Sequence, residues 1–194
     1  MDKTRLETFS DGVIAIIITI MVLELKVPHN PTWQSYLNAY PVFVSYAISF
    51  VFVGLFWSSH HDLLHAATKV NNKVIWMNML ALFWVSLIPF TTAAMGENSF
   101  TSVTVTVYAL VLVLVSASNL LLIQHLKKLH GANSVFTQDL KGNFRNYITT
   151  AVNVIAAIVA FLGLPKIAFI LIAVTSIMWF LPNNRIGSNR SNKK

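Results

Sequence analysis

The chain contains no cysteine, so it can form neither a disulfide bond nor a thiolate metal site. It is also poor in charge: only 11% of its 194 residues are charged, whereas an ordinary soluble domain carries roughly 25%. Acidic residues are especially scarce, and the net charge is +7 at pH 7. This composition excludes an ordinary soluble domain. In a membrane protein the excess of basic residues reports topology, so we do not interpret it as nucleic-acid binding.

Apolar residues make up 55% of the chain and gather in six runs. Several runs approach or exceed the roughly 20 residues that a helix needs to cross a bilayer. The sequence therefore predicts an all-α integral membrane protein with six transmembrane helices per subunit. The expected spans are residues 5–25, 36–60, 74–94, 102–125, 147–162 and 166–181. A tight turn is expected at Gly163-Leu164-Pro165, between the last two spans.

Lys and Arg residues are distributed unevenly over the expected connections. Twelve of the 14 fall on one side of the membrane, and only Lys26 and Lys166 fall on the other. The positive-inside rule then places both termini in the cytoplasm. We interpret residues 1–182 as a single six-helix transmembrane domain. Residues 183–194 are interpreted as a basic, disordered cytoplasmic tail.

The first expected span carries an aspartate near its start, in the stretch RLETFSDGVIAIIITI. Thr4 and Glu7 have the spacing of a capping box, which predicts a helix with Thr4 as its N-cap. Asp11 would then lie about 9 Å past Arg5, two turns into the helix, where an ionised carboxylate needs a partner. The alternative is a helix that starts at Ser10, with Asp11 in a first turn favoured by the helix dipole.

The predicted topology places the end of the second span at the same depth as this aspartate. That end reads LFWSSHHDLLH and is rich in polar groups. We therefore expect a network of contacts between helices or between subunits, formed by Arg5, Ser10, Asp11, Trp57, His60 and His61. Polar residues inside the other spans, such as Asn78, Ser116, Asn119 and Asn153, are expected to tie helices together rather than to form an ion route.

The adjacent histidines leave three roles open: a hydrogen-bonded structural role, a pH-sensitive role and metal binding. His60 and His61 point about 100° apart on a helix, so they cannot easily share one ion. His61 and His65 have the i, i+4 spacing of metal-binding pairs, with Asp62 nearby. Zinc needs a third and a fourth ligand, and no further ligand is evident from the spacing. We favour the structural role and predict no metal site.

One side of the first helix carries an apolar stripe with a hydroxyl group at its edge, formed by Gly12, Ile16, Ile20, Leu23 and Thr19. Around an axis shared by several copies, this stripe would form apolar rings that gate by dewetting. Such a ring disfavours Na⁺ more than K⁺, because K⁺ sheds its water more readily. The same periodicity fits side chains that face lipid or pack between helices, since almost every side of this helix is apolar. Thr19 could equally bond the backbone of Ala15.

The stretch RLETFSDGVIAIIITIMVLEL resembles the R-x-x-x-F-S-D signature that opens the first helix of the endosomal/lysosomal potassium channel family, transmembrane protein 175. The residues that match are Arg5, Phe9, Ser10 and Asp11, and they are followed by an Ile-rich run with Thr19. The segment FWSSHHDLL resembles the end of the family's second helix. The length of the chain suits the short prokaryotic members of the family.

The resemblance implies a homotetramer of six-helix subunits without a re-entrant pore loop, with the first helices lining the pore. By position, the family's narrow apolar constriction corresponds to Ile16, its hydroxyl layer to Thr19, and further apolar layers to Ile20 and Leu23. Arg5, Ser10, Asp11, His60 and His61 would hold the helices together beside the pore. The chain has a single six-helix unit, whereas eukaryotic members fuse two.

The sequence thus predicts a K⁺-selective channel of the cytoplasmic membrane that conducts without a TVGYG filter and needs no cofactor. The alternative is a proton-coupled secondary transporter that uses Asp11, His60 and His61. A membrane-embedded hydrolase is disfavoured, because the chain has no HExxH or GxSxG motif and no clustered carboxylate pair in the spans. We therefore do not expect an enzyme. The expected partners are other copies of the chain, lipid and permeant cations, K⁺ above others.

Overall fold

The computed structural model describes residues 2–139 and 145–178, and this part of the chain is helical. The predicted tail, residues 183–194, and the last residues of the sixth expected span lie outside the described residues. The elements are α1 (Lys3–Ile20), the 3₁₀ turn η1 (Met21–Glu24), α2 (Trp33–Asn38), α3 (Tyr40–Ala66), α4 (Asn72–Ser86), α5 (Ile88–Glu97), α6 (Ser102–His130), α7 (Val135–Asp139), α8 (Arg145–Phe161) and α9 (Pro165–Met178).

Within residues 2–139 and 145–178, four helical stretches are long and apolar enough to cross a membrane: Lys3–Glu24, Tyr40–Ala66, Asn72–Glu97 and Ser102–His130. They correspond to the first four expected spans. The fifth and sixth correspond to α8 and α9, which are apolar but shorter. The expected turn between α8 and α9 is present: Gly163 has φ +90°, and the Leu164 amide bonds the Val159 carbonyl over 3.1 Å. This is the Schellman arrangement, in which glycine avoids the steric cost of a positive φ.

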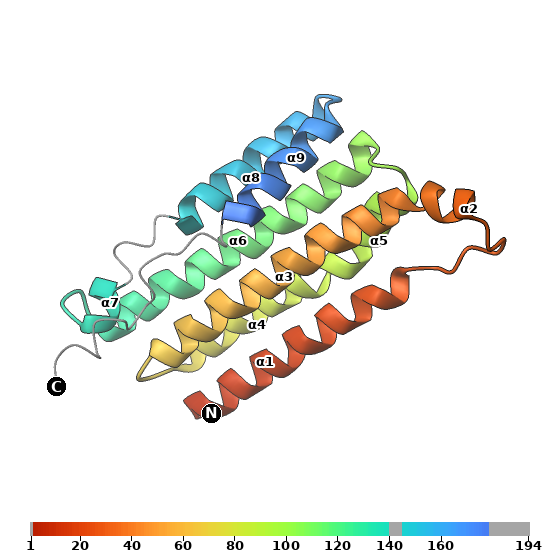
Figure 1. Cartoon of the computed structure of the whole chain (residues 1–194). Helices are drawn as coiled ribbons and strands as arrows, with labels where there is room; N and C mark the ends of the chain where they lie inside the picture. Colours follow the sequence, from red (N-terminus) through yellow and green to blue (C-terminus); the bar gives the residue numbers. More distant parts are fainter. Residues whose placement is uncertain (1, 140–144, 179–194) are drawn as a thin grey trace.

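The long helices run side by side in a bundle, with α6 in its middle (Figure 1). Helices α8 and α9 pack along one side of α6, and α4 and α5 pack along another. Helix α1 stands at the outer edge, where it contacts α3 and α4 (Figure 1). The large apolar core includes Ile14 and Ile17 of α1 together with Val53, Tyr108 and Leu112. Among the residues that the structure describes, no element packs against one long side of α1.

Buried hydroxyl groups join three helices inside this core. Ser49 of α3 lies 2.8 Å from the Tyr108 hydroxyl of α6, and Thr92 of α5 donates to Ser49 over 2.8 Å. All three residues are buried. Because the bilayer core offers no water, polar groups at such depth are satisfied by one another. The bonds fix the rotation of α3, α5 and α6 relative to one another.

The third span, expected over residues 74–94, is interrupted at Leu87. Pro89 has no amide hydrogen to donate to the preceding turn. The Leu87 amide donates to the Trp84 carbonyl, which forms a tight turn. Helix α4 therefore ends at Ser86, and α5 begins at Ile88. The two pieces together still make a span of 26 residues.

The expected capping box at the start of the first helix is wrong. Helix α1 begins at Lys3, and its N-cap position, Asp2, makes no side-chain capping bond. Thr4 lies inside the helix, where its carbonyl accepts a bond from the Thr8 hydroxyl. Glu7 turns outward to His65 of α3 instead of reaching back to the helix start. The alternative start at Ser10 is wrong as well, so Asp11 lies well inside the helix, as the favoured interpretation required.

Gly96 of α5 marks the closest approach of two helices, which yields a prediction. A Cβ atom at this position would lie 2.5 Å from Ser45 Oγ and 2.8 Å from the Val42 Cα atom. The backbone of α3 would have to move, so we expect Gly96→Ala to lower the free energy of unfolding by about 1–3 kcal/mol. Thermal denaturation of the purified protein, followed by tryptophan fluorescence, measures this loss.

Gly54→Ala is the matched control. A Cβ atom there meets only Ile18 Cδ1, at an ordinary contact distance of 4.0 Å. This variant should melt at or above the temperature of the unsubstituted protein, because alanine favours helix more than glycine does. Equal melting of the two variants would show that the α3–α5 contact does not limit stability.

Candidate functional site

Helix α1 has two faces of different character. Leu6, Ser10, Ile14 and Ile17 are buried against the bundle, and Met21 continues that face into η1. The stripe predicted from the sequence lies on the other side, and all its members are exposed in the subunit. The side-chain packing of α1 therefore fixes which face it offers to lipid or to another copy of the chain.

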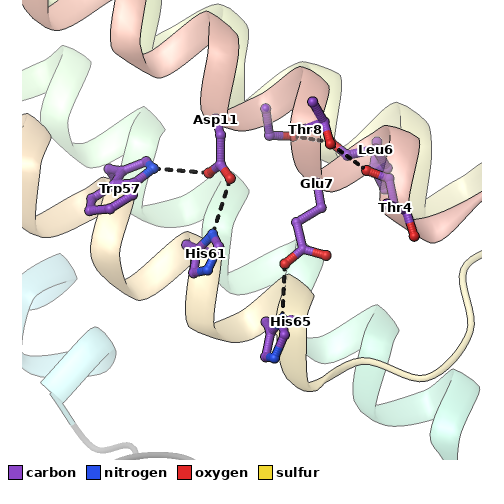
Figure 2. A network of polar contacts seen from close by, with 9 residues as sticks. Thr4, Leu6, Glu7, Thr8, Asp11, Trp57, His61 and His65 are labelled. Carbon is purple, nitrogen blue, oxygen red and sulfur yellow. Dashed lines mark hydrogen bonds and ion pairs between the residues drawn. The ribbon is translucent and has the colours of Figure 1, made fainter.

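The Asp11 carboxylate joins α1 to α3 (Figure 2). Its Oδ1 accepts a 2.9 Å hydrogen bond from Trp57 Nε1, and its Oδ2 lies 3.1 Å from His61 Nδ1. Trp57 and His61 are one helical turn apart on α3, and their rings lie 5.7 Å apart. Each carboxylate oxygen thus has its own partner, which is how a carboxylate is accommodated two turns into an apolar helix.

A second contact lies one turn closer to the N-terminus of α1 (Figure 2). Glu7 Oε1 is 3.1 Å from His65 Nδ1, and the Glu7 side chain is largely buried although His65 is exposed. Lys3 Nζ donates to the His65 carbonyl over 2.7 Å, at the C-terminal end of α3. Sequence reasoning missed the Glu7–His65 contact because it assigned Glu7 to a capping box. The spacing of Glu7 and Asp11, i and i+4, was the signal that both face α3.

A buried chain of hydrogen bonds runs behind these contacts, away from the exposed surface. Asn78 of α4 donates to Ser10 Oγ over 2.9 Å, and Ser10 in turn donates to the Leu6 carbonyl over 2.8 Å. His60 Nε2 lies 2.7 Å from Asn78 Oδ1. Because the Asn78 amide nitrogen is already donating to Ser10, its oxygen must accept, and the His60 proton therefore sits on Nε2. Asn78 ties α1, α3 and α4 together, which is the role expected of polar residues inside spans.

The structure places five of the six residues expected in the network in two sets of contacts and leaves Arg5 out. Asp11 contacts Trp57 and His61, while Asn78 links Ser10 to His60. Arg5 is exposed and has no polar partner within residues 2–139 and 145–178. Phe9, the aromatic residue of the motif, is also exposed. Both residues lie on α1 at the edge of the bundle.

The stripe points away from the subunit along its whole length. Ile16 is 59% exposed, and Leu23 is 75% exposed. The Thr19 hydroxyl donates to two carbonyl groups of its own helix, that of Ala15 over 3.0 Å and that of Ile16 over 2.9 Å. The backbone bond left open by the sequence analysis is thus present.

A groove runs beside the stripe, between α1 and α5. It has a volume of about 460 Å³ and is lined on the α1 side by Ile16 and Ile20, and on the other side by Pro89 and Phe90. Beyond its far end, Lys26 forms an ion pair with Glu97, which links the end of η1 to the end of α5. The hydrogen bond to Glu97 raises the pKa of Lys26 above its usual value. Polar contacts therefore join α1 to α3 near its N-terminus and the segment after η1 to α5 at the other end. The groove lies between these two sets of contacts.

The other polar residues within the spans lie apart from α1. Asn153 of α8 donates to Ser116 of α6 over 3.1 Å, which ties these two helices together. Asn119 lines a cavity of about 50 Å³ among α3, α6, α8 and α9, and its buried Oδ1 atom has no partner within the described chain. The volume is large enough for a few ordered water molecules, and the lining includes amide and hydroxyl groups.

Comparison with known proteins assigns the chain to a family. The family model described as endosomal/lysosomal potassium channel TMEM175 matches residues 5–89, which contain most of α1, its partners on α3 and Asn78. A potassium channel of Chryseobacterium sp. is 38% identical over 186 residues, which are 96% of each protein. The mouse endosomal/lysosomal proton channel TMEM175 is 36% identical over an alignment 101 positions long, which covers 46% of this chain but only 20% of the mouse protein.

A solved structure has the same fold. The crystal structure of a lysosomal potassium-selective channel TMEM175 homolog from Chamaesiphon minutus aligns with a TM-score of 0.78, covering 91% of this chain and 95% of that one. The two sequences are 24% identical. Together with the relative matched over nearly its whole length, this shows that the chain belongs to the TMEM175 potassium channel family, a family of ion channels and not of enzymes.

Proposed function

We propose that four copies of this chain form a K⁺-selective channel in the cytoplasmic membrane, with α1 of each copy lining a central pore. The observation that carries the proposal is the division of α1 into an anchored face and an open face. The anchored face holds Asp11 and Ser10 in contacts with α3 and α4. The open face carries Ile16, Thr19, Ile20 and Leu23 and has no partner within the described subunit.

In the proposed pore, Ile16 forms the narrowest ring, and Ile20 and Leu23 form further apolar layers. An apolar ring excludes water when it is narrow, and an ion must shed part of its hydration shell to pass. Because K⁺ is less strongly hydrated than Na⁺, the ring favours K⁺ without a carbonyl filter. The chain contains no TVGYG stretch that could form such a filter. The Thr19 layer offers oxygen atoms next to the constriction.

The proposed topology has six spans and both termini in the cytoplasm. Its support is the distribution of Lys and Arg, together with the four long helices and the two shorter apolar ones. With this orientation, Asp11 and Glu7 lie towards the cytoplasmic side, and the Lys26–Glu97 pair lies on the opposite side. Arg5 and Phe9 would then be available to a neighbouring subunit at the cytoplasmic end of the pore.

A proton-coupled carrier that uses Asp11 and the histidines is the rival proposal. Asp11 is bound by Trp57 and His61 at the same time. This arrangement suits a carboxylate with a fixed structural role better than one that gains and loses a proton during transport. In a carrier, Asp11→Asn would abolish coupled uptake, whereas in a channel it would disturb assembly or gating.

The reversal potential of the purified protein in a planar bilayer tests the function directly. With K⁺ on one side and Na⁺ on the other, we expect unitary currents that reverse near the K⁺ equilibrium potential. Reversal near zero would remove the claim of selectivity while keeping the pore. Because relatives include proton channels, a pH gradient imposed in symmetric K⁺ shows whether protons permeate as well.

Ile16→Ala tests the constriction. A smaller side chain widens the ring and lowers the cost of dehydration. If the barrier falls by about 1 kcal/mol, conductance rises about fivefold, and the reversal potential moves towards zero. The matched control is Ile158→Ala. Ile158 is 54% exposed and belongs to α8, which lies across the bundle from α1 (Figure 1). An unchanged conductance in Ile16→Ala would place the constriction elsewhere.

Ile16→Cys tests the position of the stripe in the assembly. The chain has no cysteine of its own, so the introduced thiol has only its copies in other subunits to react with. Under mild oxidation we expect disulfide-linked dimers on a denaturing gel, because the four residues face one axis. Ile158→Cys should remain monomeric. Monomers in both variants would mean that Ile16 faces lipid.

A further inference from the structure

The N-terminal part of α1 and the C-terminal part of α3 bring together a group of side chains whose chemistry K⁺ conduction does not require. Glu7, His61 and His65 each offer one ligand atom, and these atoms all lie within 4.8 Å of one another. The two histidines are one turn apart on α3, and their rings are stacked with centroids 5.9 Å apart. The carboxylate comes from α1 (Figure 2). We propose that these three residues form a binding site for a divalent transition-metal ion, of which Zn²⁺ is the example to test.

The chemistry of the three ligands selects this class of ion. Two imidazoles and one carboxylate are the ligands of many zinc sites in which a water molecule completes a tetrahedron. Imidazole ligands favour Zn²⁺ and its transition-metal neighbours, whereas Mg²⁺ and Ca²⁺ prefer oxygen ligands. Asp62, the carboxylate that the sequence places next to the histidines, does not belong to the group. The third ligand that the spacing could not supply comes instead from Glu7, on another helix.

The distances are compatible with such a site. Ligand atoms bound at about 2.1 Å in a tetrahedron lie roughly 3.4 Å apart, and Glu7 Oε1 already lies 3.1 Å from His65 Nδ1. The remaining approach requires side-chain rotation. The His65 side chain is 74% exposed and therefore has room to rotate.

Asp11 supplies the support that metal-binding histidines usually have. His61 Nδ1 lies 3.1 Å from Asp11 Oδ2, and this bond leaves Nε2 as the nitrogen that can bind an ion. A carboxylate that accepts the second ring N–H of a histidine orients the ring and strengthens it as a ligand. Asp11 is itself held by Trp57 Nε1 over 2.9 Å. The His61 ring is thus oriented before any ion binds.

The surrounding charges do not oppose a cation. Asp11 and Asp62 add negative charge to that of Glu7. Lys3 is the basic group in contact with the site, and its ammonium is engaged by the His65 carbonyl at 2.7 Å. Binding of an ion would link α1 to α3 at a point where a hydrogen bond now joins them. Binding does not depend on whether the chain conducts K⁺, so the two proposals can fail separately.

Isothermal titration of the full chain with ZnCl₂, in detergent and without a polyhistidine tag, tests the site. We expect one Zn²⁺ per chain and a melting temperature that rises with Zn²⁺ concentration. Glu7→Gln and His65→Ala should each weaken binding at least about tenfold. Mg²⁺ in excess should not compete. Titration with Co²⁺ adds a test of geometry, because the visible absorption of four-coordinate Co²⁺ is far stronger than that of the hydrated ion.

Two control variants separate this site from general attraction of cations. Asp62→Asn removes a neighbouring carboxylate, and His29→Ala removes an exposed histidine from the loop before α2. Both should bind Zn²⁺ within about twofold of the unsubstituted protein. The proposal is wrong if that protein does not bind Zn²⁺, if binding survives in both Glu7→Gln and His65→Ala, or if the controls lose it equally. Gel filtration before each titration confirms that every variant is folded.

Discussion

An ionised carboxylate inside an apolar helix must be held by partners, and this requirement organises the part of the molecule around the N-terminal half of α1. Asp11 lies well beyond the start of α1, where the helix's own amides cannot serve it. Trp57 and His61 of α3 hold one oxygen each. Once α1 is rotated to present Asp11 to α3, the positions of Glu7 and Ser10 follow, because they are neighbours on the same helix. The outward direction of Ile16 and Leu23 follows from the same rotation.

Hydropathy and depth could be predicted from the sequence because they depend on position along the chain. The apolar runs predicted the four long helices. The predicted topology placed Asp11 at the same membrane depth as Trp57 and His61, and this predicted their contact. The rotation of each helix about its axis and the choice of neighbours depend on packing across the bundle. That is why Asn78 was expected to tie helices but could not be assigned Ser10 and His60 as partners. It is also why Glu7 was expected to cap its own helix when a histidine on α3 holds it.

The interruption at Pro89 shows a second limit of sequence reasoning. Proline near the end of a span is often tolerated, and residues 72–97 as a whole are apolar enough to cross a membrane. In the structure the helix is broken at Leu87 and resumes, so that α5 can approach α3 closely at Gly96. Pro89 and Phe90 then form one wall of the groove beside α1. The break therefore shapes the surface next to the stripe, which a straight helix would shape differently.

The hydrogen bonds of the Thr19 hydroxyl have a consequence for the sign of the charge that the proposed pore admits. The single hydroxyl hydrogen is directed to backbone carbonyls of α1, so it is not available to a passing ion. What remains exposed is the oxygen lone pairs, which attract cations and repel anions. Four such oxygens around an axis would discriminate against chloride without any fixed charge. A hydroxyl group that donates its hydrogen to its own helix can in this way select cations over anions.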